Sequence, residues 1–185
     1  AVPEAVRLYQ RLGFVEEFDS LRFYKEQKQE RVHAQSLRKE ALIVQKKDLE
    51  KLASFDSKYF GANRLKVLKC LHRDYPQNCL AAWEGRRIIG YIVGRKTMEG
   101  YWVGPWVCDP TRLDVAKRLF LSCVKALDRK GELRLGMPAV NTSGIRLMRD
   151  LGFRQVSKSV RMIWGKHEYS GKPEGVFGIG GPEKG

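Results

Sequence analysis

The sequence predicts an α/β (α+β) protein in which a mixed, mostly antiparallel sheet is flanked by helices. Two observations lead to this prediction. Short apolar segments follow one another across turn pairs such as Glu84–Gly85 and Glu99–Gly100, which is typical of hairpins. Longer segments lie between these strands and carry apolar residues at every third or fourth position, which is the period of a helix packed on a sheet.

The amino-terminal part predicts a short helix and two short strands. Residues 5–12 are amphipathic, and Gly13 ends the helix because glycine takes a left-handed conformation without steric cost. FVEEF and LRFYKE are expected to form separate strands on either side of an Asp19–Ser20 turn. The highly charged residues 26–42 lack a wide apolar face, so we interpret them as a linker.

A compact unit is expected from residue 43 onward. Its longest helix is predicted to begin at Asp109–Pro110, because aspartate caps a helix and proline suits the first helical position. Asn141 or Thr142 is expected to cap a later short helix. The expected helices, each ended by a glycine or a proline, are residues 46–60, 63–75, 110–130 and 142–151. The expected strands are residues 78–83, 86–96, 101–108, 132–137, 153–157 and 159–164, and the glycine- and proline-rich tail, residues 171–185, is expected to be irregular.

The chain is strongly basic, with 35 Lys and Arg against 21 Asp and Glu and a net charge of +14. Such a balance suits an anionic partner, whether nucleic acid, a membrane surface or a phosphorylated cofactor, and charge alone does not choose among them. The basic residues are spread along the chain, which also fits a dispersed, solvated surface. Nucleic-acid binding is not expected, because the sequence has no recognition motif and no basic block with interleaved aromatic residues.

The four cysteines, Cys70, Cys79, Cys108 and Cys123, form no CxxC pair and no metal-ligand spacing with histidine. We expect free thiols in a reducing compartment and hence a cytoplasmic protein; a reactive Cys108 or a disulfide is the alternative. No apolar run approaches the ~20 residues of a membrane span, so no membrane partner is expected. The histidines are scattered, and neither a zinc site nor a Ser–His–Asp triad is expected.

One segment of the chain occurs twice. AVRLYQRLGFVEEFDSLRFYK aligns without gaps on GIRLMRDLGFRQVSKSVRMIW at a constant offset of 139 residues (144 − 5). Residues that recur unchanged in the second copy include Arg7, Leu8, Leu12, Gly13, Phe14 and Arg22. The offset is about one domain length. It predicts that residues 1–25 close a preceding module whose earlier part is absent, and that the second copy closes a complete module, 43–185.

The second copy resembles the closing motif N-x-x-A-x-x-L-Y-x-x-x-G-F of the GNAT superfamily of acyl-CoA-dependent N-acetyltransferases. The matching positions are Asn141, Gly144, Leu147, Gly152 and Phe153. Met148 stands where tyrosine is common. The order of expected elements from Ile43 to Trp164 is also similar to the GNAT fold. DSKYFGANR, YWVGPWVC and the GGPEKG ending look like the C-terminal module of tandem GNAT proteins.

The resemblance implies direct acyl transfer, in which an amine attacks the thioester of acetyl-CoA and strand N–H groups stabilise the oxyanion. It also implies a V-shaped parting between two central strands. Glu99 and Asp109, which flank the YWVGPWVC strand, are the nearest candidate bases, and Tyr9, the first-copy counterpart of Met148, is the candidate acid. The residues implied to bind acetyl-CoA are Val107, Cys108, Arg112, Val115, Ala116 and Asn141.

The chain departs from the family at the loop that binds cofactor phosphate, where R/Q-x-x-G-x-G/A is usual. Residues 111–116 read TRLDVA, so only Ala116 matches, and Asp114 puts a carboxylate where the pyrophosphate would lie.

The expected function is N-acetyl transfer from acetyl-CoA to an amine. The alternative is a degenerate module that acts as a structural or substrate-shaping partner of an active one. Residues 1–25 are expected to complete a sheet with the second module or with another copy of the chain, giving a dimer.

Overall fold

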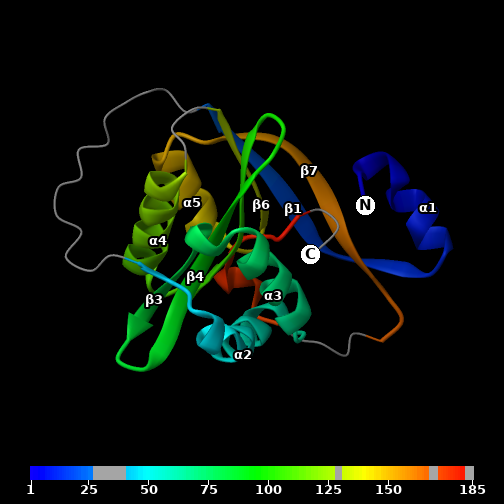
Figure 1. The fold of residues 1–185 in the computed structure, drawn as a ribbon. Coiled ribbons are helices and arrows are strands. Elements are labelled where there is room, and N and C mark those ends of the chain that lie inside the picture. The colour runs from blue at the N-terminus through cyan, green and yellow to red at the C-terminus, as the bar shows by residue number, and fades with distance from the viewer. Residues whose placement is uncertain (27–40, 128–130, 167–170, 182–185) are drawn as a thin grey trace.

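The computed structural model describes residues 1–26, 41–127, 131–166 and 171–181. Most of the expected linker, 26–42, lies outside the described residues. One sheet runs through the molecule, and helices cover both of its faces (Figure 1). The predicted α/β fold, with a mostly antiparallel sheet flanked by helices, is confirmed.

The described part of the chain forms a single eight-stranded sheet in the order β2-β3-β4-β5-β6-β1-β7, and β8 pairs with β5 outside this row. Neighbouring strands are antiparallel except β5 and β6, which run parallel. The strands are β1 (Phe14–Glu26), β2 (Leu42–Ile43), β3 (Cys79–Glu84), β4 (Arg87–Lys96), β5 (Gly100–Cys108), β6 (Glu132–Pro138), β7 (Arg154–Trp164) and β8 (Val176–Gly178). The helices are α1 (Val6–Arg11), α2 (Leu49–Phe60), α3 (Leu65–Asp74), α4 (Leu113–Ala126) and α5 (Thr142–Asp150).

Helices α4 and α5 pack on one face of the sheet and α2 and α3 on the other, so the molecule has two apolar cores. The division follows from strand geometry, because successive residues of a strand point to opposite faces. In β4, Tyr91 and Val93 are buried in the α2–α3 core, whereas Ile92 between them is buried in the α4–α5 core. None of the described helices is long and apolar enough to cross a membrane.

The amino-terminal segment completes the sheet formed by the later strands, which is one of the two arrangements expected for it, because β1 lies between β6 and β7 and pairs with both. The prediction of two short strands around Asp19–Ser20 is wrong, since β1 continues through this position for 13 residues. Pairing on both edges of β1 overrides the turn preference of an Asp-Ser pair. The two strands predicted at residues 153–157 and 159–164 are likewise one strand, β7, which starts at Arg154 and pairs along its length with β1.

The long helix α4 starts later than predicted, at Leu113, and Asp109 does not cap it. The carboxylate of Asp109 instead accepts hydrogen bonds from the N–H and the hydroxyl of Thr111, at 2.9 and 2.7 Å. This local turn competes with the helix for the same backbone donor, so the chain stays non-helical to Arg112. The helix stop predicted at Gly61 is confirmed, with a left-handed φ of 88° at the end of α2.

Candidate active site

Strands β5 and β6 part at the centre of the sheet. They pair only at their first residues, Gly100–Trp102 with Glu132–Arg134. Beyond these pairs β5 continues to Cys108 and β6 to Pro138, so a wedge opens between the two strands. This wedge is the parting of central strands that the GNAT resemblance implies.

The wedge is filled by the tail of the chain itself. Strand β8 pairs in antiparallel register with Trp106 and Val107 of β5, and the N–H of Ile179 donates to the carbonyl of Gly136 in β6 at 2.8 Å. The prediction of an irregular tail is therefore wrong for β8, whose three residues are buried. The physical reason is that the parted edges of β5 and β6 carry backbone groups that need hydrogen-bond partners when buried.

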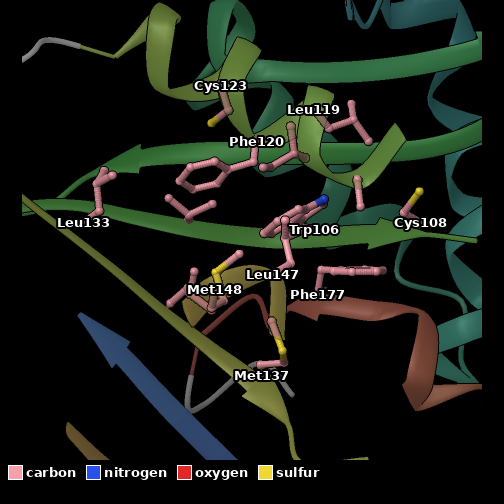
Figure 2. Close-up of a cluster of buried hydrophobic side chains, with 14 of the residues drawn as sticks. Trp106, Cys108, Leu119, Phe120, Cys123, Leu133, Met137, Leu147, Met148 and Phe177 are labelled. Carbon is pink, nitrogen blue, oxygen red and sulfur yellow. The ribbon is translucent and has the colours of Figure 1, made fainter. Parts of the chain in front are cut away.

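Side chains and a glycine hold the tail in the wedge. Phe177 is fully buried, and its ring lies 5.2 Å from the ring of Trp106 (Figure 2). The indole N–H of Trp102 donates to the carbonyl of Ile179 at 3.0 Å. A Cβ atom at Gly104 would overlap the same carbonyl, so the absence of a side chain lets β5 approach the tail this closely.

Asn141 joins the tail to helix α5. The side chain is 1% exposed, and its carbonyl oxygen accepts a hydrogen bond from the N–H of Gly144 at 2.7 Å, which confirms the predicted helix cap. Its amide nitrogen donates to the carbonyl of Val176 at 3.1 Å. The group that the resemblance assigns to acetyl-CoA thus binds the tail in this structure.

In the loop between β5 and α4, polar groups form hydrogen bonds and ion pairs with neighbouring residues. The N–H groups of Thr111 and Arg112 both donate to Asp109. The guanidinium of Arg112 pairs with the carboxylates of Glu84 at 3.2 Å and Asp114 at 3.3 Å. Hydrogen bonds from Thr111 hold the pKa of Asp109 below its ordinary value, so the loop keeps negative charge. The polar groups of this loop are therefore engaged with one another, although Lys51, Lys58, Arg86 and Arg87 line the same cavity as Asp109, Thr111 and Arg112.

The other residues assigned to acetyl-CoA, Val107, Cys108, Val115 and Ala116, are fully buried. Val107 packs in the α2–α3 core and the other three in the α4–α5 core. All four cysteines of the chain are free thiols. Burial raises the pKa of the Cys108 thiol to about 12, so this thiol stays protonated and unreactive at neutral pH.

The three candidate catalytic residues lie in separate places. Glu99 precedes β5 and pairs with Arg134 at 2.5 Å, whereas Asp109 follows the other end of this nine-residue strand. Tyr9 lies on α1, and its ring packs edge-on against Phe14 with the centroids 5.3 Å apart. The structure does not bring the three side chains together, and their catalytic roles stay predictions.

Sequence reasoning missed a cavity of about 300 Å³ between the end of α2, the tail and the middle of the β1–β7 pair. The guanidinium of Arg22 donates to the hydroxyls of Ser20 at 2.7 Å and Ser159 at 3.1 Å on its wall. Desolvation lowers the pKa of Arg22. The wall of this cavity is built from segments far apart in the sequence, so no local pattern predicts it. The recurrence of Arg22 as Arg161 in the second copy of the repeat was the sequence feature that pointed to this place.

A family model described as an acetyltransferase (GNAT) domain matches residues 52–178, which is more than half of the chain. The chain belongs to the GNAT acetyltransferase domain family. The assignment to the GNAT family, which the closing motif predicts, is therefore confirmed. Acyl transfer from acetyl-CoA to an acceptor is the chemistry that membership of the GNAT family implies. No curated protein matches the chain significantly.

Solved structures share the fold of this GNAT chain at low sequence identity. A candidate acetyltransferase from Pyrococcus horikoshii is 23% identical with a TM-score of 0.72, over 100% of this chain and 58% of that one. A GCN5-related N-acetyltransferase from Sphaerobacter thermophilus is 18% identical with a TM-score of 0.56, over 90% and 57%. A GNAT-family acetyltransferase from Colwellia psychrerythraea is 14% identical with a TM-score of 0.60, over 85% and 62%. These identities concern the fold alone, and the chain spans less than two-thirds of each protein.

Acetyl-CoA, the co-substrate of GNAT enzymes, does not fit the residues of this GNAT chain as the structure arranges them. Strand β8 pairs with β5 in the wedge, and Ile179, which follows β8, bonds to Gly136 of β6. The amide of Asn141 is taken by the tail, and Arg112 is taken by two carboxylates. Neither the arm nor the phosphates of acetyl-CoA find free partners at these positions.

Proposed function

We propose that this GNAT chain takes part in acetyl transfer from acetyl-CoA to an amine as the structural and acceptor-shaping partner of a donor-binding GNAT module. The single observation that carries the proposal is strand β8 in the wedge. An acyl donor lying between β5 and β6 would need the backbone groups that β8 already uses. The acetyl-CoA of the reaction is therefore assigned to another module.

The energetics of the tail support this proposal. Val176, Phe177 and Ile179 are buried, and exposing side chains of this size costs about 1.5–3 kcal/mol each. Asn141 would also lose a buried hydrogen-bond partner, at about 1–3 kcal/mol. A donor that displaced the tail would lose this free energy from its own binding, so weak or absent binding follows.

The cavity beside Arg22 supports the acceptor-shaping part of the proposal. Tyr59 and Phe60 at the end of α2 form one wall, and the β1–β7 pair forms another. The serine hydroxyls that bond to Arg22 do not neutralise its charge. A half-buried cation at the wall of a cavity of about 300 Å³ suits an acceptor that carries a carboxylate or another anionic group beside its amine.

Titration with acetyl-CoA tests the proposal. We expect no binding isotherm in calorimetry and no rise in Tm at millimolar acetyl-CoA, because the wedge is filled. A ligand at 100 times its Kd would instead stabilise the fold by about 2.7 kcal/mol and raise the Tm by several degrees. Saturable binding with such a rise would refute the proposal. Phe177→Ala, which loosens the tail, is the comparison variant, since binding by this variant alone would locate the block at β8.

A second candidate is an acetyltransferase that binds acetyl-CoA in this same wedge after the tail has left it. The short length of β8, three residues, favours this candidate, because few backbone hydrogen bonds hold the segment. The same titration separates the two functions. The second candidate requires that acetyl-CoA binds to the intact chain and that residues 176–179 become accessible to solvent as it binds.

A further inference from the structure

The pairing of β1 with β7 has an internal two-fold symmetry that follows the 139-residue repeat. Ser20 and Ser159 occupy equivalent positions in the two copies, and they pair directly with each other. Each strand also has one bulge. Glu17 is the extra residue in β1 and Val156 is the extra residue in β7, and these positions again differ by 139. The repeat is therefore a symmetric ribbon of two strands.

The residues at the two ends of this ribbon obey the same two-fold symmetry. A Cβ atom placed on Gly13 would lie 3.7 Å from Nε1 of Trp164. A Cβ atom placed on Gly152 would lie 3.6 Å from Nζ of Lys25. Gly13 and Gly152 are equivalent, and so are Lys25 and Trp164. The two-fold relation thus covers the helix ends as well as the strand register.

Only one of the two outer edges of the β1–β7 ribbon pairs with a further strand of the sheet. Residues 20–26 of β1 pair on their outer edge with β6. The equivalent edge is residues 159–165, which are 20–26 shifted by 139 and comprise the end of β7 and Gly165. Among the described residues no strand pairs there and Ala1 alone bonds to this edge. It uses both backbone groups of Val160: the carbonyl of Ala1 accepts from the N–H at 2.7 Å, and its ammonium donates to the carbonyl at 2.5 Å.

The helices of the two copies differ in the same way. In α5, Leu147 is 8% exposed and Met148 is 0% exposed, because both pack in the α4–α5 core. Their equivalents in α1, Leu8 and Tyr9, are 58% and 37% exposed, and Leu12 is 59% exposed. Helix α1 stands apart from α2–α5, beyond β7 (Figure 1). The same amphipathic helix is packed in one copy and uncovered in the other.

We propose that these two features form one docking face, which binds the sheet of a second GNAT module carried on the same polypeptide. The docking face consists of the edge at residues 159–165 and the apolar side chains Leu8, Tyr9 and Leu12 of α1. The two-fold relation places a strand equivalent to β6 antiparallel on that edge, so the two sheets become continuous through the ribbon. The core of the second module covers α1 as the α4–α5 core covers α5.

A second copy of this chain is not the occupant of the docking face. The partner must offer the edge of its β6-like strand, and in this chain β1 already pairs with that edge of β6. The partner is therefore a module that lacks an inserted strand of its own. The proposal does not rest on the proposed function, because the symmetry of the ribbon holds whether or not the wedge binds acetyl-CoA.

The test compares matched substitutions in the two copies of the repeat. In the 185-residue chain, Leu147→Ala is expected to lower the Tm by roughly 5–15 °C, whereas Leu8→Ala leaves it within about 1 °C. In a polypeptide that carries both modules, which is the complete polypeptide of this proposal, Leu8→Ala is expected to lower the Tm by several degrees as well. Arg11→Asp is the control, because it places on α1 the residue that the second copy has at 150; we expect no change in either protein.

Amide hydrogen exchange supplies the second measurement. The backbone groups of Met162 and Trp164 face the open edge, because those of Val160 bond to Ala1 there and residues alternate along a strand. Their amides are expected to exchange slowly in the complete polypeptide and faster in the 185-residue chain. Fast exchange there together with a silent Leu8→Ala in the complete polypeptide would overturn the proposal. So would a dimer of the 185-residue chain that Leu8→Asp dissociates in sedimentation, because the occupant would then be a second copy. Binding of acetyl-CoA to the wedge would overturn the proposed function and leave this inference unaffected.

Discussion

Replacing Phe177 with alanine is expected to lower the free energy of unfolding by about 3–5 kcal/mol, the usual cost of truncating a buried phenylalanine. The ring of Phe177 is fully buried and lies 5.2 Å from that of Trp106. Trp106 in turn stacks on Phe120 of α4 at 5.6 Å, so the truncation leaves a cavity inside the core. Urea denaturation followed by tryptophan fluorescence measures the loss.

The matched control for this substitution is Trp164→Ala in the same 185-residue chain. Trp164 ends β7 and is 69% exposed, so its removal is expected to change the free energy of unfolding by less than about 0.5 kcal/mol. If Phe177→Ala were as stable as the parent chain, the tail would not belong to the folded core, and the closed wedge would be wrong.

Replacing Arg64 with methionine is expected to cost about 3–5 kcal/mol, because it leaves a buried carboxylate without its charged partner. Asp56 of α2 is fully buried and accepts hydrogen bonds from Nε and Nη2 of Arg64, at 2.9 and 2.7 Å. The hydroxyl of Tyr91 in β4 donates to the same carboxylate at 2.6 Å. The three side chains join α2, the start of α3 and β4. Thermal unfolding followed by circular dichroism measures the effect.

Arg73→Met provides the comparison for the buried pair. Arg73 bonds to Asp74 at 2.8 Å, but its side chain is 74% exposed. Water screens an exposed pair and competes for its hydrogen bonds, so we expect the Tm to stay unchanged. A loss as large as that of Arg64→Met would mean that burial does not explain the stability of the Asp56 cluster.

Local signals were sufficient for most elements after residue 43, because they agree with the tertiary packing. Gly61 ends α2 with a left-handed φ, Asn141 caps α5, and the hairpin predicted at Glu84–Gly85 joins β3 to β4 through Gly85 and Arg86. The position of β1 could not be predicted in the same way. An Asp19–Ser20 pair favours a turn on its own, and it is extended here because β6 and β7 bind both edges of the strand.

The closed wedge could be predicted only in part. The carboxylate of Asp114 and the missing glycines of the phosphate loop are visible in the sequence. Strand β8 is not, because three residues in a glycine-rich tail show no periodicity. Their strand conformation depends on the parted edges of β5 and β6. The hydrogen bond from Asn141 to Val176 likewise joins residues 35 positions apart, and no local pattern indicates it.

Amide hydrogen exchange of residues 176–179, with and without acetyl-CoA, tests the closed wedge most directly. These residues bond to β5 and β6 and are buried in the core, so their amides are expected to exchange as slowly as those of β5. Addition of millimolar acetyl-CoA is expected to leave the rates unchanged. Rapid exchange in the free chain, or acceleration when acetyl-CoA is added, would contradict a wedge that is closed by its own tail.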